Sequence, residues 1–237
     1  MSAVVATRPS DSLASTPPLE NGDRLTRAEF ERRYAAMPEV KKAELIEGTV
    51  FMPSPAHFKQ HGRPHQLMAT WLGTYEVHTP GVEGGIDATV RLDEDNEPQP
   101  DCFLRVLPEL GGQTQNSPDD YVEGPPELAV EVAASSASYD LHQKKDAFRR
   151  NGVREYLVWV VRERRVEWWE LREGVYQPIV PSPDGSLRSR VFPGLWLDAP
   201  AVLRGELARV LALVGDGVKS QEHAAFAAQL AARHPPA

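Results

Sequence analysis

Short apolar runs, divided by turn residues, predict several β-strands along the chain. The segment "AELIEGTVFM", residues 43–52, is typical of a strand with a turn or bulge at Gly48. Further strands are predicted over residues 86–92, 102–106 and 128–133, and "GVEGG" is predicted as a turn before the first of them. The later run "EYLVWVV" is apolar throughout, which favours a central strand covered on both faces. In contrast, "RVEWWEL" and "VYQPIV" indicate hairpin strands at a more exposed edge.

Amphipathic patterns predict helices between these strands. In "TRAE" the hydroxyl and the carboxylate have the spacing at which Thr26 and Glu29 cap each other's backbone donors, so a helix is expected to begin there. A second helix is predicted between Gly62 and Val77. A third is predicted in "SYDLHQKKDAFRRNG", where the final Asn-Gly pair is a stop signal. The Ala- and Leu-rich tail from Pro200 onward predicts one or two more.

The order of these elements predicts the fold class. A strand, a helix and a strand follow one another between residues 128 and 161, which implies a crossover connection and some parallel pairing. The early and late strands look hairpin-connected, so we expect an α/β fold with a mixed β-sheet flanked by helices. Residues 1–22 have few large apolar side chains and predict a disordered tail. Residues 23–198 are then expected to form one domain, and residues 199–237 a C-terminal helical extension.

Composition narrows the function classes. The 237 residues carry a formal net charge of -8, which argues against a protein that coats polyanions indiscriminately and leaves only a local basic surface open. The single cysteine, Cys102, cannot form an internal disulfide or a thiolate zinc site and is expected to be a small buried side chain. The chain has no apolar run long enough to span a membrane and no secretory signal, so we expect a cytoplasmic protein without a membrane partner.

Two strand-like runs each carry a carboxylate at a position where the apolar pattern predicts a buried hydrophobic residue. Asp101 precedes "CFLRV", and Glu131 lies inside "LAVEVA". A buried ionised carboxylate costs several kcal/mol unless it is paired or bound to a metal. If the two strands are neighbours, both side chains can converge on one hard divalent cation such as Mg²⁺. The alternative is that each acid pairs with an arginine or lies at a solvent-facing edge.

A Pro-Asp pair that opens a strand, followed by an acid inside a second apolar strand, is the layout of the PD-(D/E)XK nuclease superfamily. That superfamily normally has a lysine two residues after the second acid, and Ala133 occupies this position here. A lysine of the following helix could reach the same place, and Lys144 lies one turn beyond Asp140. The alternative for Lys144 or Lys145 is an ordinary exposed helix lysine.

The segment "YDLHQKKDAFRRNGVREYLVW" resembles the signature of the Uma-two family of putative restriction endonucleases, a branch of that superfamily with its lysine on the helix. The pieces "ELIEG", "RLDEDNEPQPDCFL" and "GPPELAVEVAASS" follow the family's order, and the resemblance covers residues from about 40 to 170. Thr49 stands where the family has a glutamate, so the first acid is either Glu44 or Glu47. Phe148 replaces the usual tyrosine.

The resemblance implies a set of site residues. Asp101 and Glu131 are expected to bind the metal, Lys144 to stabilise charge, and Glu44 to be an additional acid. Further candidates are Glu47, His61 and Gln99.

Three histidines suggest a different site. His57, His61 and His65 are spaced four residues apart, which on a continuous helix would place three imidazoles on one face and suggest zinc. Pro64 argues against such a helix. The Uma-two family often has a histidine before its first core helix, and "KQHGRPHQ" resembles that place, which makes His61 a candidate neighbour of the active site. The alternative is ordinary capping or loop histidines.

The leading hypothesis is an endonuclease that depends on Mg²⁺ or Mn²⁺ and hydrolyses DNA phosphodiester bonds. Two alternatives stay open. One is a catalytically silent binding or scaffold protein with the nuclease fold, and the other is a metal-dependent hydrolase of another phosphate ester. A homodimer is expected by analogy, because two active sites are needed to cut both DNA strands at once.

Overall fold

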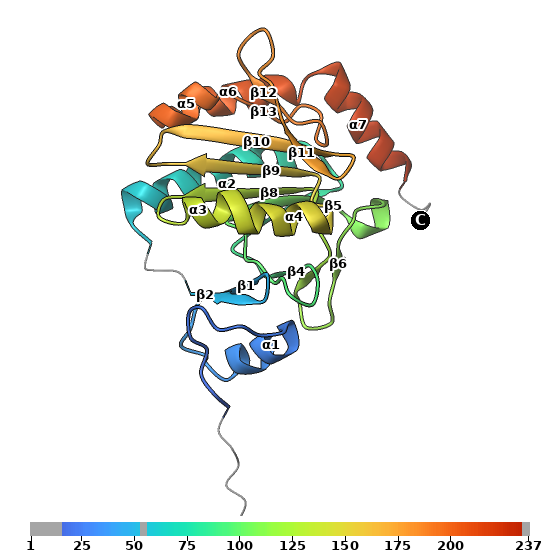
Figure 1. Cartoon of the computed structure of the whole chain (residues 1–237). Helices are drawn as coiled ribbons and strands as arrows, with labels where there is room; N and C mark the ends of the chain where they lie inside the picture. Colours follow the sequence, from blue (N-terminus) through green and yellow to red (C-terminus); the bar gives the residue numbers. More distant parts are fainter. Residues whose placement is uncertain (1–15, 53–55, 234–237) are drawn as a thin grey trace, which may run out of the picture.

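A six-stranded mixed sheet forms the centre of the molecule (Figure 1). The computed structural model describes residues 16–52 and 56–233. The strand order is β11-β10-β9-β8-β5-β3, with β8 and β9 parallel and the other neighbouring pairs antiparallel. The predicted crossover and the predicted fold class are therefore confirmed. The bounds are Val82–Ile86 (β3), Cys102–Val106 (β5), Leu128–Ala133 (β8), Glu155–Val160 (β9), Arg165–Arg172 (β10) and Val175–Pro178 (β11).

Helices cover both faces of this sheet. α2 (Arg63–Val77) lies against one face, behind the sheet in Figure 1. The opposite face carries a helical segment that ends at Gly152, whose φ of 85° is left-handed, as the Asn-Gly stop signal predicts. The parts of this segment are α3 (Ala137–Tyr139), the π-type turn η3 (Asp140–Lys144) and α4 (Lys145–Asn151).

The C-terminal residues add three helices, where the sequence predicts one or two. α6 packs against α2, and Val210, Val214 and Leu230 are buried in the core that α2 shares with the sheet. The C-terminal segment therefore contributes to the main core and is not appended to it, because its apolar side chains complete the packing around α2. The bounds are Ala199–Arg204 (α5), Leu207–Gly217 (α6) and Gln221–Ala232 (α7).

The alternation of side chains along β8 separates the two cores. Val130 and Val132 belong to the apolar cluster that contains α2, whereas Ala129 and Ala133 belong to the cluster that contains Phe148 of α4. Glu131 lies between these two alanines in the alternation. Its carboxylate is therefore on the α4 side of the sheet, in a region that would otherwise be apolar core.

A smaller N-terminal layer lies below the sheet in Figure 1. It contains the predicted first helix, α1 (Arg27–Ala35), with Thr26 as the residue before it. The predicted reciprocal cap is not formed, because Thr26 makes no side-chain cap hydrogen bond and the Glu29 carboxylate instead accepts from Arg32 and Arg33 at 2.7 Å. Two arginines within one turn attract the carboxylate more strongly than a backbone amide.

The predicted turn at Gly48 joins β1 (Glu44–Ile46) to β2 (Thr49–Phe51) as a hairpin. Glu47 and Gly48 have φ angles of 53° and 67°, the left-handed pair that a tight two-residue hairpin requires. The predicted disordered tail, residues 1–22, falls largely on residues 1–15, which lie outside the described residues. Leu19, within that prediction, is buried against Phe30 and Leu45.

The "GVEGG" segment is largely a strand and not the predicted turn. Gly85 lies in β3 opposite Phe103 of β5. A Cβ atom at Gly85 would lie 2.2 Å from the Phe103 ring, so only glycine allows the ring to lie against this backbone. The remaining elements are short: Val90–Arg91 (β4), Gln115–Asn116 (β6), Val122–Glu123 (β7), Leu187–Arg188 (β12), Trp196–Leu197 (β13) and Pro108–Leu110 (η2).

Cys102, at the start of β5, is buried as expected for a small apolar side chain, and this burial raises the pKa of its thiol. Within residues 16–52 and 56–233, none of the helices is long and apolar enough to cross a membrane.

Candidate active site

The register of the sheet places the two unusual carboxylates side by side. Cys102 of β5 is opposite Val130 of β8, so the preceding Asp101 is next to Glu131. The amide of Val132, the residue after Glu131, donates a 2.8 Å hydrogen bond to Asp101 Oδ2. Asp101 and Glu131 are 3% and 4% exposed. The condition for a shared site, that the two strands are neighbours, is therefore met.

Lys144 extends from the helical segment into this group of acids. Its Nζ lies 2.7 Å from Glu131 Oε1 and 2.7 Å from Glu44 Oε1, and the residue is 2% exposed. It belongs to the π-type turn η3, on the helical segment that covers the α4 face of the sheet. Lys144 is therefore not an exposed helix lysine, and the partner of Glu131 is a lysine and not an arginine. We call Glu44, Glu131 and Lys144 the lysine cage.

The structure separates the two candidates for the first acid. Glu44 Oε1 contacts Lys144 and also accepts a 2.7 Å hydrogen bond from the backbone amide of Gln99. The Gln99 side chain turns away and donates to Thr89 Oγ1 at 3.1 Å. Glu47 lies in the hairpin turn and forms an ion pair with Arg150. Glu44 is thus in the lysine cage, and Glu47 is outside it.

Burial and charge together set the protonation of the lysine cage. Burial by itself would lower the pKa of Lys144, but the carboxylates of Glu131 and Glu44 raise it well above its ordinary value, so the ammonium form persists. Burial raises the pKa of Glu131 well above its usual range. The neighbouring acids Asp101, Asp140 and Glu44 raise it further, and Lys144 offsets only part of this effect. Asp140, one turn before Lys144, has a pKa raised to about 6 by burial. The region carries more acid than its own cations neutralise.

One buried oxygen of this region faces the lysine ammonium. Glu131 Oε1 lies 2.7 Å from the Lys144 ammonium, and no other residue in 16–52 or 56–233 donates a hydrogen bond to it. Carboxylate oxygens are the ligands that Mg²⁺ and Mn²⁺ prefer in proteins. The donor set of Asp101 and Glu131 therefore fits a hard divalent ion.

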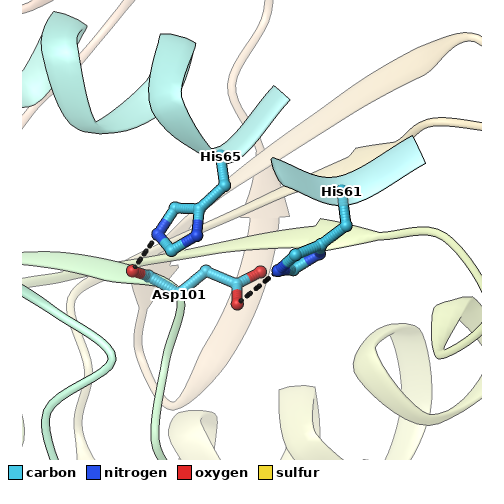
Figure 2. A group of neighbouring side chains, drawn as sticks. All are labelled: His61, His65 and Asp101. Carbon is cyan, nitrogen blue, oxygen red and sulfur yellow. Dashed lines mark hydrogen bonds and ion pairs between the residues drawn. The ribbon is translucent and has the colours of Figure 1, made fainter. Parts of the chain in front are cut away.

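The helix that precedes α2 corrects the expectation for the histidines. A π-type turn, η1 (Phe58–Gly62), runs directly into α2, and Pro64 lies in the first turn of α2. Proline is tolerated there because it follows a π-type turn, in which the regular α-helical hydrogen bonding is already interrupted. His61 and His65 consequently lie one turn apart and both point toward Asp101 (Figure 2). His57 precedes the helical turn and is exposed.

Both imidazoles contact Asp101, and each has one further polar contact. His61 Nδ1 lies 3.1 Å from the Val132 carbonyl, and its Nε2 lies 3.5 Å from Asp101 Oδ1. His65 Nε2 lies 2.7 Å from the Asp101 carbonyl, and its Nδ1 lies 4.0 Å from Asp87 Oδ2. One ligand atom from each of His61, His65 and Asp101 lies within 4.8 Å of the others. We call these three residues the histidine cluster.

Lys42 is a member of the site that sequence reasoning missed. Its Nζ lies 2.9 Å from Asp87 Oδ1 and 3.5 Å from Asp101 Oδ1. Burial acts to lower the pKa of Lys42, but Glu44, Asp101 and Glu131 outweigh this effect and raise it. The sequence contains no signal for this role, because a lysine in the polar segment before a strand is ordinarily solvated.

A basic hollow lies close to the start of α2. Its volume is about 250 Å³, and none of the predicted site residues lines it. The cations among its lining residues are Lys59, Arg63, Arg164 and Arg204, with no acidic residue among the lining. Lys59 and Arg63 belong to the same helical stretch as His61 and His65, so the hollow and the histidine cluster are carried by one element.

Comparisons with known proteins point to nucleases. The sequence model of the Uma2 (Uma-two) family, described as "Putative restriction endonuclease", matches residues 27–200. A crystal structure of a putative nuclease belonging to DUF820 from Anabaena variabilis ATCC 29413 has a similar fold, with a TM-score of 0.51 and 11% identity. The likeness covers 77% of this chain and 97% of that one. No curated protein matches the chain significantly.

Proposed function

This chain belongs to the Uma2 family of putative restriction endonucleases, and on that premise we propose that it is a metal-dependent endonuclease acting on DNA. One observation carries the proposal beyond family membership. Lys144 lies between Glu44 and Glu131, and Glu131 follows Val130, the residue opposite Cys102, so that it is next to Asp101. This arrangement combines acidic metal ligands with a buried ammonium, and both can lower the barrier to phosphodiester hydrolysis.

Asp101 and Glu131 are the residues proposed to hold Mg²⁺ or Mn²⁺. When bound, such an ion polarises the phosphate and lowers the pKa of a coordinated water. The Val132 amide holds Asp101 Oδ2 in a fixed position through its 2.8 Å hydrogen bond. The backbone amide of Gln99 holds Glu44 in the same way at 2.7 Å. Both carboxylates are therefore oriented before any ligand arrives, which reduces the cost of reorganisation.

Lys144 is proposed to stabilise charge and not to act as a base. The carboxylates that surround it keep its pKa well above the ordinary value, so it has no lone pair near neutral pH. Its ammonium can favour hydroxide over water and offset the negative charge that grows on the phosphate. Glu44 and Glu131 position this ammonium together, each through a carboxylate oxygen 2.7 Å from it.

The basic hollow supports DNA as the substrate. The chain as a whole has a formal net charge of -8, so phosphate binding has to be local. Lys59, Arg63 and Arg164 supply such a local positive surface, whereas the fourth lining cation, Arg204, is paired with Glu206 at 2.6 Å. We propose that a DNA phosphate outside the scissile one binds there.

Cutting both strands at once needs two active sites, so a homodimer is part of the proposal.

The test is plasmid nicking with Mg²⁺ or Mn²⁺. Wild type should nick, while Asp101→Asn and Glu131→Gln should lose at least two orders of magnitude in rate, since each removes one ligand charge without changing side-chain size. Glu127→Gln is the matched control. Glu127 is also buried beside β8, but it accepts backbone hydrogen bonds from Val106 and Gln113 and has no place in the site.

The outcomes separate the candidate functions. Equal nicking by wild type, Asp101→Asn and Glu131→Gln rules out the proposed metal ligands. Absence of nicking together with Mg²⁺-dependent hydrolysis of a nucleotide or another phosphate ester favours the broader hydrolase. Absence of both reactions favours a catalytically silent binding protein, in which the lysine cage is only a structural ion-pair network.

A further inference from the structure

We propose that the histidine cluster binds a divalent transition metal, with Zn²⁺ as the reference ion. This site is distinct in chemistry from the oxygen-only pair of Asp101 and Glu131, although both use Asp101. It does not depend on endonuclease activity, because it rests on the arrangement of His61, His65 and Asp101 alone. Imidazole nitrogen favours zinc, cobalt, nickel and copper, whereas Mg²⁺ is bound through oxygen.

The helix supplies the correct spacing. His61 and His65 are four residues apart across the junction of η1 and α2, so the two rings are on the same side of one helical stretch. Asp101 reaches them from the sheet. Ligands about 2.1 Å from a tetrahedral zinc ion lie roughly 3.4 Å from one another. The 3.5 Å between His61 Nε2 and Asp101 Oδ1 already matches this spacing, and all three ligand atoms lie within 4.8 Å.

The hydrogen bonds of the two rings leave one ligand nitrogen free on each. A backbone carbonyl can only accept, so the nitrogens that contact the Val132 and Asp101 carbonyls, at 3.1 Å and 2.7 Å, carry the protons. In the neutral rings the lone pairs are then on His61 Nε2 and His65 Nδ1. Donation of the second ring N–H to a carbonyl is the usual outer-sphere support of metal-binding histidines.

The remaining polar atoms form a local surplus of acceptors. The lone pair of His61 Nε2 faces Asp101 Oδ1, and two acceptors 3.5 Å apart repel each other unless a cation lies between them. His65 Nδ1 and Asp87 Oδ2 form a second such pair at 4.0 Å. Lys42 Nζ lies 2.9 Å from Asp87 Oδ1 and 3.5 Å from Asp101 Oδ1, so at Asp101 it contacts the same oxygen that faces His61. A metal ion at the cluster would relieve the pair formed by His61 and Asp101.

The site is also accessible to an ion in solution. The His61 and His65 side chains are 25% and 13% exposed, compared with 2% for Lys144. A metal can therefore enter from the α2 edge without disrupting the lysine cage. Because Asp101 Oδ2 is held by the Val132 amide, Oδ1 is the oxygen left to face the histidines.

The experiment is titration of the chelator-treated full chain with Zn²⁺ in a calorimeter, with Co²⁺ absorption as a second probe of tetrahedral nitrogen ligation. One ion per chain is expected, and excess Mg²⁺ should not displace it. His61→Ala and His65→Ala should each weaken Zn²⁺ binding by at least tenfold. His57→Ala is the matched control, because His57 precedes the same helical stretch but lies outside the cluster.

Two further variants keep the result interpretable. His65→Gln retains a donor for the Asp101 carbonyl, so a loss of Zn²⁺ binding in a variant with an unchanged melting temperature identifies a lost ligand and not a lost fold. Glu131→Gln should abolish nicking but leave Zn²⁺ binding within threefold, which separates this proposal from the proposed function. Absence of Zn²⁺ binding in wild type, or equal binding in wild type and both alanine variants, overturns it.

Discussion

The lysine cage and the histidine cluster share one pair of neighbouring positions in the sheet, yet their carboxylates are compensated differently. Glu131 faces a buried ammonium that Glu44 also contacts. Asp101, its neighbour, faces the more exposed imidazoles of His61 and His65. In the lysine cage the protein supplies the cation itself. In the histidine cluster Asp101 faces the two rings and has only the longer 3.5 Å contact with Lys42, which leaves part of the compensation to an exchangeable cation or a proton.

Two neighbouring carboxylates can therefore have different roles, one in the stability of the fold and the other in ligand binding. A carboxylate with a fixed buried partner becomes part of the folded structure, and removal of the partner leaves a buried charge. A carboxylate among accessible lone pairs can exchange its partner without unfolding the chain. The lysine cage should therefore respond to substitution mainly through stability, and the histidine cluster mainly through metal affinity.

The largest effect is expected for Lys144→Met. Loss of this ammonium leaves Glu44 and Glu131 buried without a cation, which should lower the free energy of unfolding by about 3–5 kcal/mol and abolish nicking. Urea denaturation measures the loss. Lys145→Met is the matched control, since the Lys145 ammonium lies 3.5 Å from the centre of the Trp169 ring and contacts no site residue, so about 1 kcal/mol is expected. Similar losses in the two variants would contradict the lysine cage.

A smaller and pH-dependent effect is expected for Asp140→Asn. The pKa of Asp140 is raised to about 6, so the folded protein binds this proton more tightly than the unfolded chain does. Its contribution therefore favours folding at low pH and is lost as the pH rises through about 6. The variant should gain stability relative to wild type between about pH 4 and pH 7, by up to about 3 kcal/mol. Urea denaturation across this range measures the gain, and a constant difference would contradict the raised pKa.

The smallest effect is expected for Glu47→Gln. The ion pair of Glu47 with Arg150 is partly exposed, so its loss should change the free energy of unfolding by about 1 kcal/mol or less and leave nicking intact. Glu44→Gln is the counterpart and should lower nicking by roughly tenfold or more, because it releases Lys144. Plasmid nicking by the two purified variants makes the comparison. If Glu47→Gln lost more activity than Glu44→Gln, Glu47 would be the acid of the site.

Local sequence patterns determined the elements and the fold class. The apolar runs "LAVEV" and "EYLVWVV", with an amphipathic helix between them, predict the parallel pair β8 and β9 because burial on both faces leaves a continuous apolar pattern. The same pattern identified Asp101 and Glu131 as candidate site residues, because an acid interrupts an otherwise apolar run. Where a tertiary contact overrides local preference, the prediction was wrong. Gly85 lies in a strand because the Phe103 ring covers it. The expectation for Pro64 failed for a local reason, since this proline lies in the first turn of α2, directly after a π-type turn.

Only the tertiary structure decided which side chains meet. That Lys144 contacts both Glu44 and Glu131, that Glu47 does not, and that Lys42 approaches Asp101 all depend on contacts between distant parts of the chain. The histidines, likewise, reach Asp101 only because η1 and α2 are continuous. A local pattern records whether a residue is buried, since burial depends on the period of its own element. Which partner it meets depends on strand register and on the path of the helices across the sheet, and these are set by the packing of the whole chain.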